Sequence, residues 1–147
     1  MAGRRARNMS VPVNQRSHGK LEACVRAHDL CVYTLQITAN KNVFTVEYQA
    51  ALTDRIIATA FNIHTLTWSA NNTLVKTPED LRKRQKLQED AAIQCNILLS
   101  LIEIAKPIFH LTTKRVVYWS SMAIETRGLI RAWKETDARR YKEKTGV

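Results

Sequence analysis

The chain has 147 residues, of which 45% are apolar, and this is enough for one domain with its own core. Only four glycines and three prolines interrupt it, a composition that favours long helices over a strand-rich fold with many turns. The net charge is +10, and no apolar run comes close to the roughly 20 residues that a membrane-spanning helix needs, so we expect no membrane contact.

The positive charge is concentrated at the two ends of the sequence. Residues 1–42 carry seven Lys or Arg against two acids, residues 107–147 carry nine against four, and the segments between them are balanced. In a bundle of antiparallel helices the first and last helices are neighbours, so the two basic segments would form one positive surface. Because such a field attracts polyanions, of which nucleic acid is the commonest, we expect a binding surface rather than an active site.

The first predicted elements are a basic arm and a helix. We expect residues 1–18 to form a flexible basic arm. A helix is predicted over 20–39, because its core-forming side chains recur at steps of three and four residues: Leu21, Cys24, His28, Cys31 and Leu35. The cysteines are odd in number and are expected to be reduced core thiols of an intracellular protein.

The second helix is predicted over 45–71, with Thr45 as its N-cap. No Asp, Glu, Lys or Arg occurs from Ile56 to Val75, and a helix that lacks charge around most of its circumference is usually buried on more than one side. We therefore expect this helix to contact another subunit. The residues predicted to form a subunit or partner interface are Phe44, Tyr48, Ile63, Trp68 and Trp133.

The third helix is predicted over 78–106 and has the clearest start signal of the chain. Thr77 suits the N-cap, Pro78 suits the first helical position, and Pro107 is expected to end the helix. The fourth helix is predicted over 112–141, with a basic tail over 142–147. The sequence thus predicts an all-α fold, an antiparallel up-down-up-down four-helix bundle over residues 19–141.

The sharpest candidate site is a basic stripe on the fourth helix. Arg127, Arg131 and Lys134 lie at positions i, i+4 and i+7, and guanidinium groups pair bidentately with phosphate. The alternative is an ordinary solvated helix face. The residues predicted to bind nucleic acid come from both basic segments: Arg16, Lys20, Arg26, Arg127, Arg131, Lys134, Arg139, Arg140 and Lys142.

A denser basic run over residues 82–86 is predicted to be structural. It neutralises itself through i,i+4 pairs, of which Asp80–Arg84 and Lys86–Asp90 are examples. Of the three tryptophans, Trp119 is expected to pack in the core, while Trp68 and Trp133 could either pack or stack on bases.

No pattern in the sequence indicates an enzyme. Cys24, His28 and Cys31 share a helical face, but a zinc site would need a fourth ligand from elsewhere, and small core side chains are the favoured interpretation. There is no phosphate-binding glycine loop and no nucleophile beside an evident histidine partner. We therefore predict no catalytic residue, no metal and no cofactor.

Six segments of the chain form a recognisable order and spacing: residues 30–38 (Leu-Cys-Val-Tyr-Thr-Leu-Gln-Ile-Thr), Phe44, residues 52–56 (Leu-Thr-Asp-Arg-Ile), residues 98–105 (Leu-Leu-Ser-Leu-Ile-Glu-Ile-Ala), Tyr118-Trp119 and residues 130–133 (Ile-Arg-Ala-Trp). Together they resemble the four-helix-bundle family of ribosomal-RNA intervening-sequence proteins. Within that family, the chain is most similar to the accessory variability determinants of diversity-generating retroelements. The likeness extends over about residues 20–140.

The resemblance implies a basic bundle that assembles into a pentameric barrel. It also implies a cytoplasmic protein that is bacterial or is encoded by a phage or mobile element. It also implies binding to a reverse transcriptase and to template RNA or an RNA/DNA hybrid, in support of mutagenic cDNA synthesis. The chain departs from its relatives after Phe44, where residues 45–49 carry no positive charge, so no nucleic-acid contact is expected there. The alternative function is an oligomeric helical scaffold that docks on an acidic protein partner without binding nucleic acid.

Overall fold

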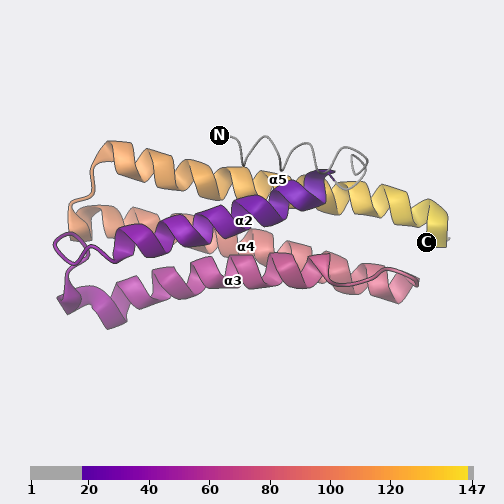
Figure 1. The fold of residues 1–147 in the computed structure, drawn as a ribbon, viewed down its shortest axis with the longest axis horizontal. Coiled ribbons are helices and arrows are strands. Elements are labelled where there is room, and N and C mark those ends of the chain that lie inside the picture. The colour runs from indigo at the N-terminus through magenta and orange to yellow at the C-terminus, as the bar shows by residue number, and fades with distance from the viewer. Residues whose placement is uncertain (1–17, 146–147) are drawn as a thin grey trace, which may run out of the picture.

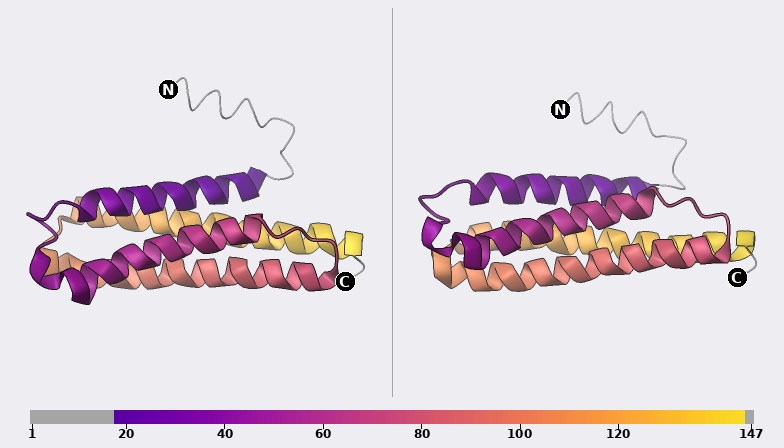
Figure 2. Two further views of the ribbon diagram at one scale, coloured as in Figure 1. Left: turned by 60° about the horizontal axis from the view of Figure 1, so that its bottom comes forward. Right: turned by 90° about the horizontal axis from the view of Figure 1, so that it is seen from below.

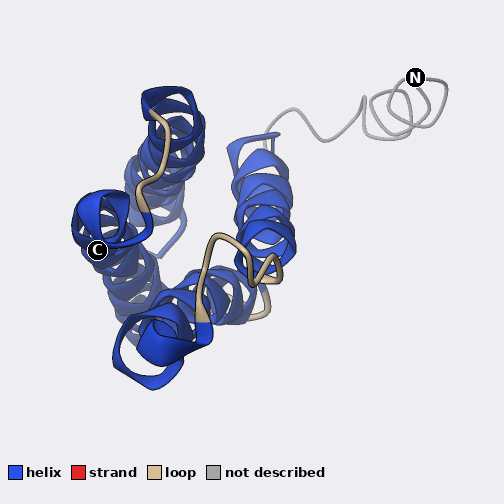
Figure 3. Cartoon of the chain, turned by 90° about the vertical axis from the view of Figure 1, so that its left-hand side faces the viewer, coloured by secondary structure: helices blue, strands red, loops and turns tan. Residues whose placement is uncertain are grey.

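The computed structural model describes the backbone of residues 18–145 and the side chains of residues 22–141. Within this part of the chain the protein is all-α, with no strand, as the sequence predicts. Its long helices are α2 (His18–Thr38), α3 (Asp54–Asn71), α4 (Pro78–Phe109) and α5 (Thr113–Thr145). They lie side by side along one long axis, and consecutive helices run in opposite directions (Figure 1). Seen end-on, α2 lies between α3 and α5 on one side of the molecule (Figure 3).

Residues 1–17 of the predicted basic arm lie outside the described residues, and His18 is the first residue of α2. The predicted tail is helical as far as Thr145. α5 therefore continues past residue 141, where the sequence led us to expect its end.

The predicted helix over 45–71 is three elements rather than one. A 3₁₀ turn, η2 (Val46–Tyr48), is followed by a π-helical segment, η3 (Gln49–Thr53), and only then by α3. Thr45 has extended backbone angles, but its side chain makes no capping hydrogen bond. Thr45 therefore does not cap a helix, and the chain enters α3 through the tightly wound 3₁₀ turn and then the more widely wound π-helical segment. Figure 2 shows the bend before α3.

The start of α4 matches its prediction. The Thr77 hydroxyl accepts a hydrogen bond from the Asp80 amide at 3.1 Å, and the Asp80 carboxylate accepts from the Thr77 amide at 3.1 Å. This reciprocal capping box satisfies N–H groups that the first turn of a helix leaves unpaired.

The predicted end of α4 at Pro107 is wrong, because the helix runs to Phe109. Proline removes one backbone donor near the end of the helix, and burial of Phe109 in the core holds the next residues in place. The helix ends at His110, which takes the left-handed conformation with φ 55°, and the Leu111 amide donates to the Lys106 carbonyl at 3.0 Å.

The core is centred on Trp119 of α5, which is fully buried. Its ring packs edge-on against Phe44 at 6.1 Å, and its indole Nε1 donates to the hydroxyl of Thr34 on α2 at 3.0 Å. The prediction that Trp119 packs in the core is confirmed. The hydrogen bond fixes the register of α2 against α5.

The second half of α4 carries exposed apolar residues. By length and composition alone α4 could cross a membrane, contrary to the expectation from the sequence, although the core helix of a soluble protein passes the same test. Only a third of the most apolar stretch of α4 is buried, and Ile93, Ile97 and Ile104 are exposed. We refer to these residues as the α4 stripe. Their spacing of four and seven residues places them on one side of the helix.

Candidate nucleic-acid interface

The basic stripe predicted on the fourth helix lies along the edge of α5 that faces α4. Arg127 Nη1 donates to the side-chain oxygen of Asn96 on α4 at 2.7 Å. Lys134 Nζ lies 3.0 Å from the carboxylate of Glu89, also on α4. The lysine is thus neutralised by an ion pair, whereas the arginine is held only by a neutral amide.

Arg127 and Arg131 retain their charge for a ligand. Among the described residues neither has an ion-pair partner, and Arg131 is exposed. They lie one helical turn apart, so their Cβ atoms are about 6 Å from each other and both side chains leave the same side of the helix. We call these two residues the α5 cationic pair.

The other predicted cations have mixed placements. Arg26 of α2 lies 3.5 Å from Glu125 of α5, and Arg139 lies 3.9 Å from Glu135 one turn away on its own helix. Arg140 is partly buried near the end of α5 and has an interaction of its own. The side chains of Arg16, Lys20 and Lys142 lie outside the described residues.

Arg84 corrects the interpretation of the basic run over 82–86. Its side chain is only 3% exposed, and it pairs with Asp137 of α5 at 3.0 Å rather than with Asp80 in solvent. It also donates to the backbone carbonyl of Thr73 at 2.6 Å and lies over the ring of Trp133, 5.9 Å from its centroid. Asp80 is occupied by the capping box, which explains why the i,i+4 pair does not form.

The burial of Asp137 changes the charge of the α5 surface. The sequence treats this acid as one of four that offset the nine cations of residues 107–147. In the structure it is 1% exposed, and its carboxylate also accepts a hydrogen bond from Gln88 at 2.9 Å. One acid is thereby withdrawn from the α5 surface and one cation from α4, so the outer face of α5 is more positive than its sequence indicates.

The predicted interface residues divide into two groups. Phe44, Ile63 and Trp133 are buried in the chain's own core, at 0%, 0% and 3% exposure, and these placements correct the expectation that they reach a partner subunit. Apolar residues at helical spacing usually pack in the chain's own core, and the sequence alone does not distinguish core residues from residues that contact a partner. Tyr48 is half-buried against Phe109, whereas Trp68 is 38% exposed beside His64.

The exposed apolar residues of α2, α3 and α4 include two groups. One is the α4 stripe, and the other, which we call the α2–α3 patch, comprises Leu35 of α2 with Phe61 and Trp68 of α3. Between them runs the outer edge of α3, where Asn62 donates to Gln94 of α4 at 3.2 Å. The patch contains Trp68, which the sequence does identify. Ile93, Ile97 and Ile104 were missed, although their repeat is visible in the sequence.

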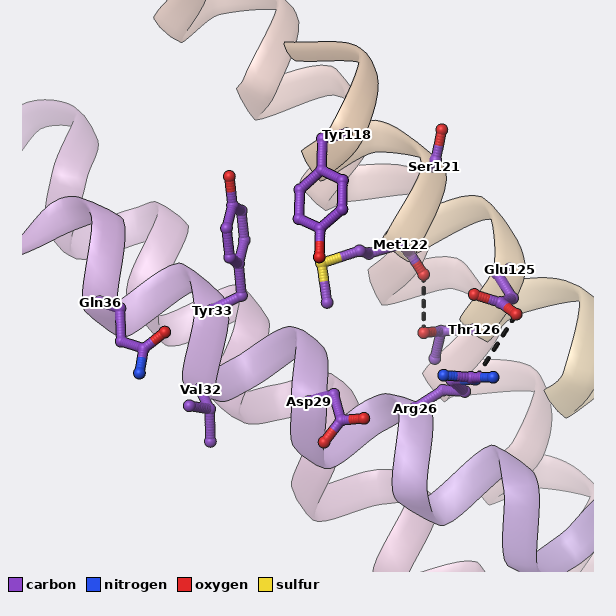
Figure 4. A pocket seen from close by; sticks show the side chains of 10 residues that line it. All are labelled: Arg26, Asp29, Val32, Tyr33, Gln36, Tyr118, Ser121, Met122, Glu125 and Thr126. Atoms are coloured by element: carbon purple, nitrogen blue, oxygen red, sulfur yellow. Dashed lines mark hydrogen bonds and ion pairs between the residues drawn. The ribbon is translucent and has the colours of Figure 1, made fainter. Parts of the chain in front are cut away.

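A groove of about 490 Å³ separates α2 from α5 on the side away from α4. Figure 4 shows Tyr33 and Tyr118 at one end of it and the Arg26–Glu125 ion pair at the other. Sequence reasoning missed this groove, because neither tyrosine is distinguished from core aromatics until the helices are placed.

The cysteines and histidines do not assemble into a metal centre in the part of the chain that the structure describes, where no group of three His, Cys, Asp or Glu could hold an ion. Cys24 and Cys31 are buried, while the exposed ring of His28 lies 6.1 Å from that of His64. Burial raises the pKa of the Cys95 thiol to about 12, against the opposing charges of Arg127 and Arg131. A thiol with so high a pKa is protonated at neutral pH and is a poor nucleophile.

Comparisons with protein-family models, with curated proteins and with solved structures found no match to this chain.

Proposed function

We propose that this protein is a non-enzymatic accessory factor of a diversity-generating retroelement, acting in the cytoplasm of a bacterial host. In this role it binds the reverse transcriptase together with template RNA or cDNA and so supports mutagenic cDNA synthesis. The observation that carries the proposal is the α5 cationic pair, together with the motif resemblance over residues 20–140. Arg127 and Arg131 lie one turn apart with no carboxylate partner among the described residues.

The proposed mechanism is electrostatic. Each guanidinium offers two parallel N–H donors to a phosphate, and binding releases the counterions that were condensed on the nucleic acid. The hydrogen bond to Asn96 leaves Arg127 charged while restricting its rotamers, so less side-chain entropy is lost when a phosphate binds. Such contacts hold the template in place without reading its sequence.

We further propose that the protein forms a closed homo-oligomeric ring, with a pentamer as the expected size. The support is that the α4 stripe and the α2–α3 patch are different surfaces of one chain. A dimer with twofold symmetry buries the same patch on both subunits, whereas two different patches that fit each other generate a ring when the rotation between subunits closes. The α4 stripe of one subunit would then contact the α2–α3 patch of the next.

The test is a titration of labelled structured RNA with the purified protein at about 50 and 200 mM salt. We expect tight binding that falls steeply with salt, and the double variant Arg127→Ala with Arg131→Ala should lower the salt slope by about one unit for each phosphate contact removed. The matched control removes two exposed cations from α4, in the variant Arg82→Ala with Lys86→Ala. Both double variants change the net charge equally, so a loss confined to the first assigns binding to α5.

A flat titration at 50 mM salt would overturn nucleic-acid binding. The positive charge would then serve an acidic protein surface, and the protein would be a helical scaffold. Equal losses in the two double variants would instead mean that net charge alone attracts RNA, without a defined site on α5.

A further inference from the structure

The α2–α5 groove has the composition of a site for a flat, polar ring. Its walls are aromatic at one end, where Tyr33 and Tyr118 meet edge-to-face with ring centroids 5.1 Å apart. Tyr33 is half-buried, and its other neighbour is the core residue Trp119 at 6.4 Å. Tyr118 is 56% exposed. One tyrosine is therefore anchored in the molecule, while the second has ring surface free for a ligand.

The polar side chains of the groove match the edge of a nucleobase. Asp29, one of whose carboxylate oxygens lies 3.2 Å from His28 Nδ1, and Glu125 offer further carboxylate lone pairs that accept hydrogen bonds from exocyclic amino groups. Gln36 offers both a donor and an acceptor. The Tyr33 hydroxyl, whose pKa burial raises above its ordinary value of 10.0, is a further donor. These groups lie on both helices and face a space of about 490 Å³, which is large enough for one base with its sugar.

The charges in and around the groove distinguish a base from a phosphate. The groove is lined by two carboxylates, Asp29 and Glu125, and by one guanidinium, that of Arg26, which is already paired with Glu125. A phosphate would be repelled there. Arg115 lies one turn before Tyr118 on α5, close enough to Tyr33 to oppose the rise in its pKa. The neutral part of a nucleotide thus fits inside the groove, and its phosphate fits beside Arg115 at the aromatic end.

We propose that the α2–α5 groove binds one unpaired nucleobase of RNA or single-stranded DNA, stacked on the ring of Tyr118. The inference rests on the proposed function and adds a second kind of contact to it. The α5 cationic pair holds phosphates on the side of α5 that faces α4, whereas the groove on the opposite side holds a base that is not paired in a duplex. The protein would consequently prefer single-stranded regions of the template to double-stranded ones.

The experiment compares two labelled RNAs, a hairpin with a single-stranded loop and a blunt duplex of the same stem, with wild type, Tyr118→Ala, Tyr118→Phe and Val117→Ala. Val117 is the matched control, since it is the neighbouring residue on α5, is 57% exposed and does not line the groove. One base stacked on an aromatic ring contributes about 1–3 kcal/mol, so Tyr118→Ala should weaken hairpin binding by roughly 5- to 150-fold. Duplex affinity and the salt slope should not change, and Tyr118→Phe should bind as wild type does.

Three outcomes would overturn the inference. If Tyr118→Ala binds the hairpin normally while Arg127→Ala with Arg131→Ala does not, the groove is not a base site and the proposed function still stands. If Tyr118→Ala weakens hairpin and duplex equally, the tyrosine acts through the fold or through a nonspecific contact. If RNA affinity is unchanged but binding to the reverse transcriptase is lost, the groove is a protein-docking site. A wild-type protein that binds neither RNA at 50 mM salt would remove the proposed function as well.

Discussion

The two sides of α5 are built differently. Where α5 meets α4, two cations are neutralised, because Arg84 pairs with Asp137 and Lys134 with Glu89, whereas Arg127 is held only by the neutral amide of Asn96 and keeps its charge. Where α5 meets α2, the core is held by the Trp119–Thr34 hydrogen bond, and the polar residues above it line an open groove. A basic helix therefore does not present its charge evenly, because neighbouring helices determine which cations remain available to a ligand.

The buried Arg84–Asp137 ion pair, on the side of α5 that meets α4, is where a substitution should have the largest effect. Replacing Asp137 with Ala leaves the Arg84 guanidinium, which is 3% exposed, without a counterion. Removing one partner of a buried pair typically costs about 3–5 kcal/mol, since the remaining charge is desolvated and uncompensated. We expect that loss in the free energy of unfolding, measured by urea denaturation monitored by circular dichroism.

Glu135→Ala is the control for this variant, because Glu135 lies on the same helix and pairs with Arg139 in solvent at 3.9 Å. It should change the free energy of unfolding by less than about 1 kcal/mol. Similar small effects in both variants would mean that Arg84 is reached by water, and the contrast between the two sides of α5 would be lost.

On the α2 side the matching test is Thr34→Val. The substitution keeps the shape of the side chain but leaves the buried indole N–H of Trp119 without its acceptor. An unsatisfied buried donor costs about 1–3 kcal/mol, so the variant should unfold at a lower urea concentration with an unchanged slope.

Thr38→Val provides the comparison one turn further along α2. Its hydroxyl is also buried, but it donates to the backbone carbonyl of Thr34 at 2.7 Å within the same helix. That carbonyl still accepts the helical backbone hydrogen bond when the hydroxyl is removed. Thr38→Val should therefore be the milder change. An equal cost at both positions would show that hydroxyl burial matters rather than the link to Trp119.

The sequence predicts where the long helices lie along the chain, but it does not predict which residues make contacts between them. The all-α fold and the N-cap at Thr77 depend on local spacing and local hydrogen bonds, and both predictions are confirmed. The end of α4 at Phe109 was missed, because burial in the core outweighed the local signal of Pro107.

The candidate site shows the same limit. The pairing of Arg84 with Asp137 spans 53 residues, and no local pattern predicts it. For the same reason Ile63 and Trp133, which are core residues, could not be separated in advance from Trp68, which is exposed. Which apolar side of a helix is buried is decided by helices far away in the sequence, and the composition of one helix does not contain that information.

The capping box at the start of α4 provides a smaller test, which depends on pH. Thr77→Ala should cost about 1 kcal/mol, the usual value for an N-cap. The backbone amide of Lys76 and then that of Thr77 hold the pKa of Asp80 below its ordinary 3.8. Since the pKa of Asp80 is lower in the folded protein, the unfolded chain takes up the proton first as the pH falls. The contribution of Asp80 to the free energy of unfolding is therefore complete above pH 3.8 and is lost as the pH falls through the folded pKa.

The measurement compares wild type with Asp80→Asn by urea denaturation at pH 6 and at intervals down to pH 3. The difference between the two proteins should shrink as the pH falls. A difference that stays constant would assign the effect of Asp80 to geometry rather than to its charge.

The smallest expected effects are those of the exposed ion pairs, one on each side of α5. Lys134–Glu89 joins α5 to α4 at 3.0 Å, and Arg26–Glu125 joins it to α2 at 3.5 Å. Double-mutant cycles with alanine should give coupling energies of about 0–1 kcal/mol for each, and both should decline in 1 M salt, because exposed charges are screened. The Lys134 pair should be the stronger, as it is shorter and Lys134 is less exposed than Arg26. A coupling of more than about 2 kcal/mol at Arg26–Glu125 would mean that this pair closes the end of the groove rigidly. The groove would then keep its shape without a ligand, whereas a weak pair leaves Arg26 free to turn toward a bound nucleotide.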